Sequence, residues 1–506
     1  MKSKIYNFFI KYGIFIILAV ALIVRVFKIE QLPVGLHADE AGMAYDAFCL
    51  SYFRVDRTLN HLPVYLINFG GGQSALYAYC TAIFIRIFGF RIFSFRITAV
   101  IFNICAIFAI YLMAEKHLGK KSALLLAGLF SICPWNIMAS RWGLDCNLLA
   151  PCSIISIWLL LRAEKWYDYI FAGLGFGITL YTYALSYLIL PIFLFLTIIA
   201  MLCTKKITFK NLIIFSIVLG LLAIPLILMI FVNNGIISEI KGFITIPKLP
   251  TYRSTEISLK NILDNLDLFK VLLIDDDLPS DAIRPFGTIY NIGIILAIIG
   301  FINETYVLIK SIKNKKFNIN MVMYFLFLSV TIVMMIIRIP SIYKANAMCL
   351  PLIFFDYSAI KLLSKKYKIV AYIILIYYII AFGIFTYYYF TQYGVKYEYQ
   401  VLFDNDMFKG LTQINTREEL KDKKVIITTS SPAPHIYTLV SNPISPYDFN
   451  NTKTQDENYG KYTFNSTEID EDSVYLVRDN FDLVWTLNTV CGFKLEQYGV
   501  YYLLYK

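Results

Sequence analysis

The chain has 506 residues, of which 58% are hydrophobic and 16% are charged, and its mean hydropathy is +0.62. This balance excludes a soluble globular domain and is typical of a protein that crosses a membrane many times. The net charge of +11 would suggest a nucleic-acid partner in a soluble protein, but here the basic residues lie in short loops between apolar runs, where such residues set topology, so we expect no nucleic-acid partner.

The apolar runs predict eleven membrane-spanning helices, since one span needs about 20 predominantly apolar residues. The predicted spans are about 12–28, 96–114, 122–139, 148–163, 167–181, 185–203, 211–232, 288–310, 319–338, 346–363 and 369–391. With the N-terminus in the cytoplasm, every strongly basic short loop falls on the cytoplasmic side. The sequence therefore predicts a multi-pass protein of the cell membrane whose C-terminal part lies outside the cytoplasm.

The segment 74–90 is also apolar enough to span a membrane. A full crossing there would move the basic loop 115–121 to the outside, against the charge rule. We therefore predict that 74–90 is a helix lying in the outer membrane interface.

The chain divides into a transmembrane module, 1–391, and a small α/β domain, 392–506. The module has a first external loop, 29–95, and a long external loop, 233–287, whose length and mixed polarity suggest a mobile lid. In the tail, the sequence predicts strands at 423–430, 473–479 and 500–506, with a helix at 431–440.

Acidic residues gather on the predicted external face. Asp39 and Glu40 follow the first span, Asp145 lies at the outer end of another, and the loop 233–287 carries the run 275–277 and Asp281. Carboxylates are costly in a bilayer and mark functional sites there. Basic residues on the same face include Arg141, Arg284, Arg338 and Lys344. Cations that hold a phosphate beside a carboxylate base suit a lipid-linked phosphate substrate.

Each candidate also has a purely structural interpretation. Asp39 and Glu40 would cap the helix that begins beside them, because acids favour helix N-termini. Asp145 and the run 275–277 would be solvated loop residues. The glycines 70–72 predict a tight turn. His37 and His61 would be hydrogen-bonded structural residues, because loop histidines are more often structural than ligands.

Three further stretches complete a familiar pattern around the acidic pair. They are "RIFSFRITAV" (91–100), "EKHLGKKSALLLAGLF" (115–130) and "SRWGLD" (140–145). In this order they resemble the GT-C membrane glycosyltransferases, in particular family 39, the group of protein O-mannosyltransferases and aminoarabinose transferases. The resemblance covers roughly residues 12–345. It implies a GT-C fold with interface helices in the first external loop.

The resemblance also implies an activity: transfer of a sugar from a polyprenyl-phosphate donor, outside the cytoplasm, with inversion at the anomeric carbon. The matching catalytic position is Asp39, with Glu40 beside it, and Asp145 matches a second acidic position that orients or neutralises. In such a displacement a carboxylate takes the proton of the acceptor hydroxyl. The phosphate leaves as a stable anion, so no strong acid is needed, and nearby cations stabilise its charge.

The sequence departs from the family in the first loop. Aminoarabinose-type members often carry an acid-base-Pro-Pro run there, whereas this chain has "LNHLPVYL" (59–66) with a single proline. No metal or substrate contact is carried over to that segment, so no cofactor is assigned and a divalent cation stays an open alternative. For the donor phosphate we expect Arg338 first, then Lys344 and Arg284. Further substrate-site candidates are His37, His61 and Arg141.

The leading hypothesis is an integral membrane glycosyltransferase that attaches a sugar to a glycan, lipid or protein acceptor of the cell envelope, with the tail domain guiding the acceptor. A transporter or flippase of lipid-linked glycans is the alternative, and it requires charged residues along a path inside the spans. A third hypothesis is a non-enzymatic envelope-assembly protein that binds through its tail.

Overall fold

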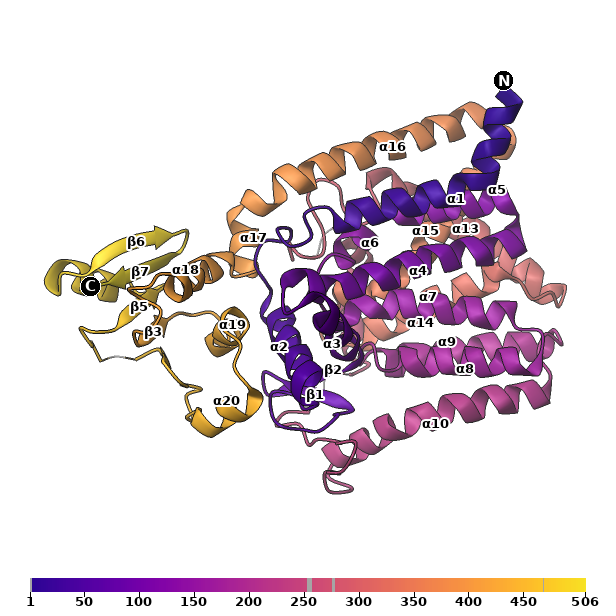
Figure 1. Ribbon diagram of the computed structural model, residues 1–506. Coiled ribbons are helices and arrows are strands. Elements are labelled where there is room, and N and C mark those ends of the chain that lie inside the picture. The colour runs from indigo at the N-terminus through magenta and orange to yellow at the C-terminus, as the bar shows by residue number, and fades with distance from the viewer. Residues whose placement is uncertain (1, 253–256, 275–277, 467) are drawn as a thin grey trace.

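The computed structural model describes residues 2–252, 257–274, 278–466 and 468–506. Its centre is a bundle of long helices that run side by side (Figure 1). The bundle consists of α1 (Lys2–Val26), α4 (Ile92–Leu118), α5 (Lys120–Ile132), α6 (Pro134–Ala139), η1 (Asp145–Leu148), α7 (Leu149–Arg162), α8 (Trp166–Thr179), α9 (Ser186–Cys203), α10 (Phe209–Asn233), α13 (Asn291–Lys313), α14 (Ile319–Ile336), η3 (Tyr343–Met348), α15 (Cys349–Lys366) and α16 (Lys368–Thr391). Every predicted span is helical, because an apolar segment in lipid satisfies its backbone only within itself.

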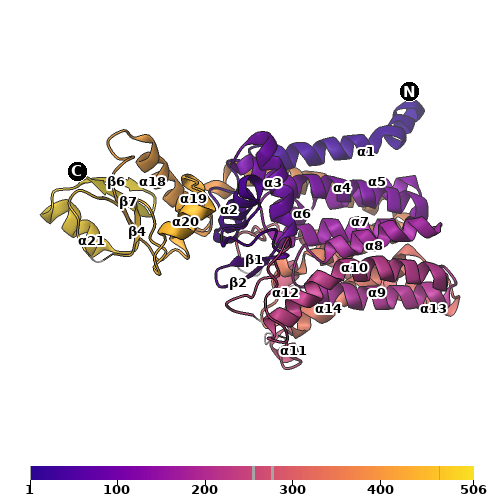
Figure 2. The ribbon, with the colours of Figure 1, turned by 60° about the horizontal axis from the view of Figure 1, so that its bottom comes forward.

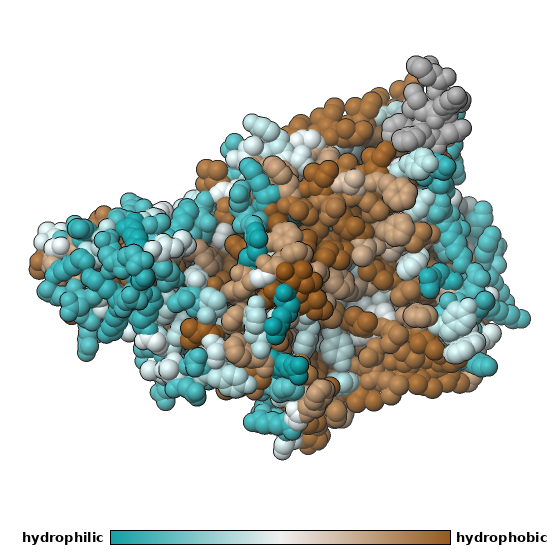
Figure 3. Space-filling model, in the orientation of Figure 1, coloured by the Kyte–Doolittle hydropathy of each residue, from teal (hydrophilic) through white to brown (hydrophobic). Residues whose placement is uncertain are grey.

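Eight helices of the described residues are long and apolar enough to cross a membrane. The remaining predicted spans are α1, the α5–α6 pair, which is broken at Pro134, and the short α8. Hydrophobic side chains form a broad belt over the bundle, and hydrophilic ones cover both of its ends (Figure 3). The chain is therefore a multi-pass membrane protein.

Two of the bundle helices carry buried carboxylates. Glu304 on α13 accepts hydrogen bonds from Ser358 Oγ at 2.5 Å and Asn320 Nδ2 at 2.7 Å. Asp356 on α15 accepts one from Tyr378 Oη at 2.8 Å. These bonds tie neighbouring helices together, as polar groups in membrane bundles commonly do.

The first external loop folds at one end of the bundle, between the helices and the C-terminal domain (Figures 1 and 2). It contains α2 (Ala38–Phe53), the antiparallel strands β1 (Tyr65–Asn68) and β2 (Gly71–Ser74), and α3 (Leu76–Phe88). The 13 residues of α3 extend only about 20 Å, too short to cross a bilayer, and its position in the membrane interface stays a prediction. The glycine run was predicted as a tight turn, but only Gly70 lies in the turn, and Gly71 and Gly72 belong to β2.

The long external loop contains two short helices, α11 (Asn261–Asp264) and α12 (Leu268–Leu273). It is attached to the first loop, because Thr245 N–H donates to His61 O at 3.0 Å and Thr245 O accepts from Val64 N–H at 2.9 Å. It is also attached to the end of α14, where Asn265 Nδ2 donates to the carbonyl oxygens of Met334, Met335 and Ile337. Motion of this loop as a lid stays a prediction.

The C-terminal residues form a five-stranded mixed sheet with helices around it. Its elements are α17 (Tyr397–Leu402), α18 (Asn405–Thr416), β3 (Val425–Thr428), α19 (Pro434–Ser441), α20 (Pro446–Thr452), β4 (Tyr462–Phe464), β5 (Val474–Val477), α21 (Phe481–Trp485), η5 (Thr486–Val490), β6 (Lys494–Tyr498) and β7 (Tyr501–Tyr505). The strand order is β4-β3-β5-β7-β6, with β4, β3 and β5 parallel and β5, β7 and β6 antiparallel. The predicted strands are β3, β5 and β7, and the predicted helix is α19.

This domain packs directly on the first external loop. Buried residues of α2, α3, α18, α19 and the sheet share one hydrophobic cluster. Tyr45 Oη on α2 donates to Ile444 O at 3.0 Å, and Asn450 Nδ2 on α20 donates to Arg57 O at 2.7 Å. The first loop is thus enclosed between the bundle and the C-terminal domain, and the N-terminus lies at the opposite end of the bundle (Figure 1).

Candidate functional site

Asp39 lies in the first turn of α2 and keeps its side chain 39% exposed. The helix is capped by His37, whose Nδ1 accepts the Asp39 N–H at 3.2 Å. The carboxylate of Asp39 itself accepts a hydrogen bond from Asn68 Nδ2 at its Oδ1, at 3.0 Å. Capping of α2 is therefore performed by the histidine, and the Asp39 carboxylate is left for other contacts.

Glu40 points the opposite way, into the protein, because successive residues of a helix are rotated by about 100°. Its carboxylate forms a fully buried ion pair with Arg96, with Arg96 Nε donating to Oε1 at 2.8 Å and Nη2 to Oε2 at 3.0 Å. Gly143 N–H donates to Oε1 at 2.7 Å. The catalytic support expected of Glu40 beside Asp39 stays a prediction: its contacts among the described residues lie inside the protein, where it pairs with Arg96.

Arg96 organises the turn that precedes α2. Its Nη1 donates to Ile29 O at 2.9 Å and Pro33 O at 2.8 Å, and its Nη2 donates to Gly35 O at 2.7 Å. One side chain of α4 therefore fixes the path of the chain from α1 to Asp39. Arg96 belongs to the "RIFSFRITAV" stretch, but no local pattern in the sequence predicts this role.

Asp145 is brought close to Asp39 by the hairpin β1–β2. Asn68, at the end of β1, bonds Asp39, and Ser74, at the end of β2, donates its N–H to Asp145 Oδ2 at 3.0 Å. Asp145 also accepts from Cys146 N–H at 2.8 Å and is only 6% exposed. The hairpin therefore links Asp145 to Asp39 through its two ends. The run 275–277 lies outside the described residues.

The three candidate phosphate ligands have different surroundings. Arg338 follows α14, is exposed, and has no hydrogen-bond or ion-pair partner in the described part of the chain. Lys344 Nζ donates to Ile339 O at 2.7 Å. Arg284 is exposed at the approach to α13.

Arg141 was expected as a substrate-site residue, and the structure corrects this. It is 0% exposed and donates to the carbonyl oxygens of Val24, Arg25, Phe27 and Leu32 at 2.5–3.1 Å. Its Nε donates to Tyr389 Oη at 3.3 Å. All of its contacts hold the end of α1 against α16, so Arg141 is an internal anchor.

The two candidate histidines have contacts within the protein. The His37 ring packs edge-on against Trp142 and Phe403, with centroids 5.6 and 6.4 Å apart. His61 lies 2.7 Å from the carbonyl oxygen of Phe243 through its Nδ1, and so joins the two external loops. His37 therefore lies beside Asp39, whereas His61 connects the first external loop to the long external loop.

Residues that the sequence did not indicate complete the surroundings of Asp39. They are Asn68, Arg96, Trp142 and Phe403. Asn68 is an unremarkable polar residue in a short strand, and Phe403 lies far along the sequence, so neither has a recognisable pattern. Among the described residues, no group of three or more His, Cys, Asp or Glu side chains is arranged to hold a metal ion.

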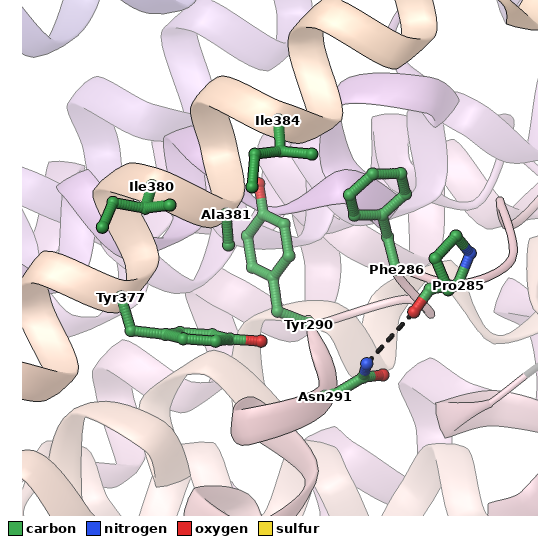
Figure 4. A pocket seen from close by; sticks show the side chains of 8 residues that line it. All are labelled: Pro285, Phe286, Tyr290, Asn291, Tyr377, Ile380, Ala381 and Ile384. Carbon is green, nitrogen blue, oxygen red and sulfur yellow. Dashed lines mark hydrogen bonds between the residues drawn. The ribbon is translucent and has the colours of Figure 1, made fainter.

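A separate groove lies between the start of α13 and α16 (Figure 4). Its walls are Pro285, Phe286, Tyr290, Asn291, Tyr377, Ile380, Ala381 and Ile384. Its one drawn hydrogen bond joins Asn291 Nδ2 to Pro285 O at 3.1 Å. The lining is largely apolar and holds no carboxylate or cation, so the groove is not a site for acid–base chemistry.

The bundle and the folded external loop, with Asp39 at one end of the bundle, have the overall fold of solved membrane proteins of the GT-C class. The chain is similar to ArnT from Cupriavidus metallidurans bound to undecaprenyl phosphate, with a TM-score of 0.58, 10% identity and 97% of each chain covered. The apo structure of the same protein gives a TM-score of 0.58 and 11% identity, again over 97% of each chain.

A family model described as dolichyl-phosphate-mannose-protein mannosyltransferase matches residues 73–230, under a third of the chain. A sequence search against characterised proteins gave no match. The expected GT-C fold is therefore confirmed.

Proposed function

We propose that the chain is an inverting glycosyltransferase. It moves a sugar from a polyprenyl-phosphate donor to a hydroxyl group of a cell-envelope glycan, lipid or protein, on the extracytoplasmic side. The observation that carries the proposal is the state of Asp39: an exposed carboxylate with one oxygen held by Asn68, at the end of a membrane-embedded bundle. The similarity to ArnT, whose structure contains undecaprenyl phosphate, supports a lipid-phosphate donor.

The geometry of Asp39 fits a general base. Oδ1 accepts from Asn68, and the nearest charged-group atom to Oδ2 is His37 Nδ1 at 3.7 Å, beyond hydrogen-bond distance. Oδ2 is therefore the oxygen that takes the proton of the acceptor hydroxyl. As that proton leaves, the hydroxyl oxygen forms a bond to the anomeric carbon on the face opposite the phosphate. The bond from this carbon to the phosphate oxygen breaks, and its electron pair leaves with the polyprenyl phosphate.

The leaving phosphate needs positive charge rather than a proton. Arg338 is the first choice, because its guanidinium is exposed and has no partner among the described residues. Asp145 is proposed to hold the hairpin in register beside Asp39, through its bond from Ser74 N–H.

The transporter alternative has less support. Its requirement is a path of charged groups inside the bundle. Glu304 and Asp356 are buried in α13 and α15, but each carboxylate is bonded to a neighbouring helix, and neither belongs to the residues that line the groove of Figure 4.

The test is transfer by the purified protein in lipid nanodiscs from a panel of polyprenyl-phosphate sugars. We expect Asp39→Asn to lower the rate about 10²- to 10⁴-fold, the usual contribution of a general base. Its donor binding and melting temperature should stay those of the wild type, because Asp39 is exposed. Full activity of Asp39→Asn would refute the assignment of Asp39 as the base. If the wild type consumes no donor of the panel, the proposed glycosyltransferase function is refuted.

A further inference from the structure

A line of polar side chains leads from the interior of the first loop to Asp39. Asp46 on α2 is 1% exposed and pairs with Arg57, whose Nη2 lies 3.2 Å from Asp46 Oδ2. Arg57 Nη2 donates in turn to Asn68 Oδ1, and Asn68 Nδ2 donates to Asp39 Oδ1 at 3.0 Å. The line therefore ends on the carboxylate that we propose as the base.

The contact with Arg57 decides which way the Asn68 amide faces. A guanidinium only donates hydrogen bonds, so the side of Asn68 that meets it must be the carbonyl oxygen. The NH₂ group then faces Asp39 and Gln73, whose Oε1 accepts from it at 3.1 Å. A flipped amide would set donor against donor at Arg57 and acceptor against acceptor at Asp39.

Arg57 is itself held in place by hydrogen bonds to α2 and to β1. Its backbone N–H donates to Asp46 Oδ1 at 2.9 Å, and its Nη2 also donates to Ile67 O at 3.2 Å. The line passes over Gly42, one helical turn after Asp39. A Cβ at Gly42 would lie 2.7 Å from Asn68 Oδ1 and 3.1 Å from the Arg57 guanidinium. The close approach of the three groups thus requires a glycine there.

We infer that Asn68 is a positioning residue for the reaction. It holds Oδ1 of Asp39, keeps the carboxylate in one orientation and leaves Oδ2 directed at the acceptor hydroxyl, while Arg57 fixes the amide as a donor. This inference rests on the proposed function.

Other groups also act on Asp39, and the test must separate them from Asn68. His37 is the nearest, and it belongs to the same turn. Asp145 lies at the other end of the same hairpin, where it accepts from Ser74 N–H at 3.0 Å. A substitution at Asn68 leaves the side chains of His37 and Asp145 themselves unchanged.

The first measurement needs no substrate. A water-soluble carbodiimide labels protonated carboxyl groups, and peptide mass spectrometry reports the label on Asp39 as a function of pH. We expect the midpoint of labelling to move to higher pH in Asn68→Ala, which loses the donor, and further in Asn68→Asp, which adds a second carboxyl group beside Asp39. Asn234→Asp is the matched control, since it adds the same charge at the exposed end of α10, and its midpoint should stay that of the wild type.

The second measurement is transfer. In Asn68→Ala we expect kcat to fall about 10- to 100-fold, the range for losing a hydrogen bond to a charged group, with the donor KM nearly unchanged. The acid limb of the pH–rate profile should move in the same direction as the labelling midpoint. If Asn68→Ala is poorly folded, the nearly isosteric Asn68→Asp provides the comparison.

The outcomes distinguish the two claims. An unchanged labelling midpoint in both Asn68 variants overturns the positioning role, whatever the activity. A wild type that transfers sugar, with an inactive Asp39→Asn and a fully active Asn68→Ala, also overturns it and leaves the proposed function standing. A wild type without transferase activity refutes the function, while the labelling still decides whether Asn68 holds Asp39.

Discussion

The carbonyl oxygen of Phe403 accepts a hydrogen bond from the backbone N–H of Leu36 at 2.8 Å. The two residues lie 367 positions apart in the sequence, and the bond places the C-terminal domain against the turn that leads into α2. The Phe403 ring then packs on Trp142, with centroids 5.7 Å apart, and on His37. The C-terminal domain is therefore part of the wall around Asp39.

Gly35 tests this contact. It has φ of +64°, and a Cβ there would overlap the carbonyl oxygen of Phe403. We expect Gly35→Ala to separate the C-terminal domain from the loop, seen as faster limited proteolysis near residues 392–405 and reduced transfer. Gly89→Ala is the control: Gly89 has φ of +81° but nothing within 4 Å of its Cβ position, so it carries the backbone strain alone. Equal damage by both substitutions would mean that strain, and not the contact, is responsible.

The neighbours Asp39 and Glu40 should respond to substitution in opposite ways. Glu40→Gln leaves the Arg96 charge buried without its partner, which costs about 3–5 kcal/mol. We expect a lower melting temperature and yield, with kcat retained in the folded fraction. Asp39→Asn should keep the melting temperature and lose kcat. Thermal unfolding and active-fraction-corrected rates of the two variants make the comparison, and a stable Glu40→Gln with low kcat would restore Glu40 as a catalytic candidate.

Arg141 should prove to be an anchor. Arg141→Lys cannot reach all the carbonyls that the guanidinium binds at the end of α1, so we expect destabilisation of at least about 3 kcal/mol. The donor KM of the folded protein should not change. Differential scanning fluorimetry and donor titration measure the two quantities. A raised KM at an unchanged melting temperature is the result that a substrate-binding role would give.

Arg338 should act on the donor alone. Removing one charge-assisted bond to the phosphate in Arg338→Gln is expected to raise the donor KM about 10- to 100-fold. The melting temperature should stay constant, because Arg338 is exposed. Arg54→Gln removes the same charge from the exposed end of α2 and serves as the control. Equal KM values for both variants would exclude Arg338 from the phosphate site.

His435 gives the contact of α19 with the first loop a pH dependence. Burial, with Arg57 and Lys453 nearby, lowers the pKa of His435 to about 3, against about 6.5 in an unfolded chain. Between these values the unfolded chain binds the proton and the folded one does not, so stability falls as the pH drops below about 6.5. We expect a loss of about 1–2 kcal/mol at pH 5 relative to pH 7, measured by thermal unfolding. His435→Gln should flatten this part of the profile, and an unchanged slope would assign it to other groups.

The bundle was predictable because lipid demands long apolar helices and because basic loops mark one side. The sheet was predictable where its strands are buried on both faces, as in β3, β5 and β7. The strand β6 was missed because Lys494, Glu496 and Gln497 are polar and the strand is largely exposed, and β4 because it has three residues. The hairpin β1–β2 was missed because its second strand begins with two glycines, which predict a turn.

The site was predictable only in outline. An acidic pair at the end of a span marks a position, but it does not say which acid faces outward. That depends on Arg96, more than fifty residues away, which draws Glu40 inside. No sequence pattern marks Asn68, because its proposed role depends on its hydrogen bonds to the Arg57 guanidinium and to the Asp39 carboxylate. Contacts of this kind are set by tertiary packing and not by local pattern.

The strand β7 lies between β5 and β6 in the sheet, although it follows both of them in the sequence. The domain that supplies Phe403 therefore cannot complete its sheet until residues 501–505 have been made. Asp39 precedes this strand by 462 residues. A growing chain thus carries the Asp39 carboxylate through the synthesis of all those residues before the wall beside it is complete.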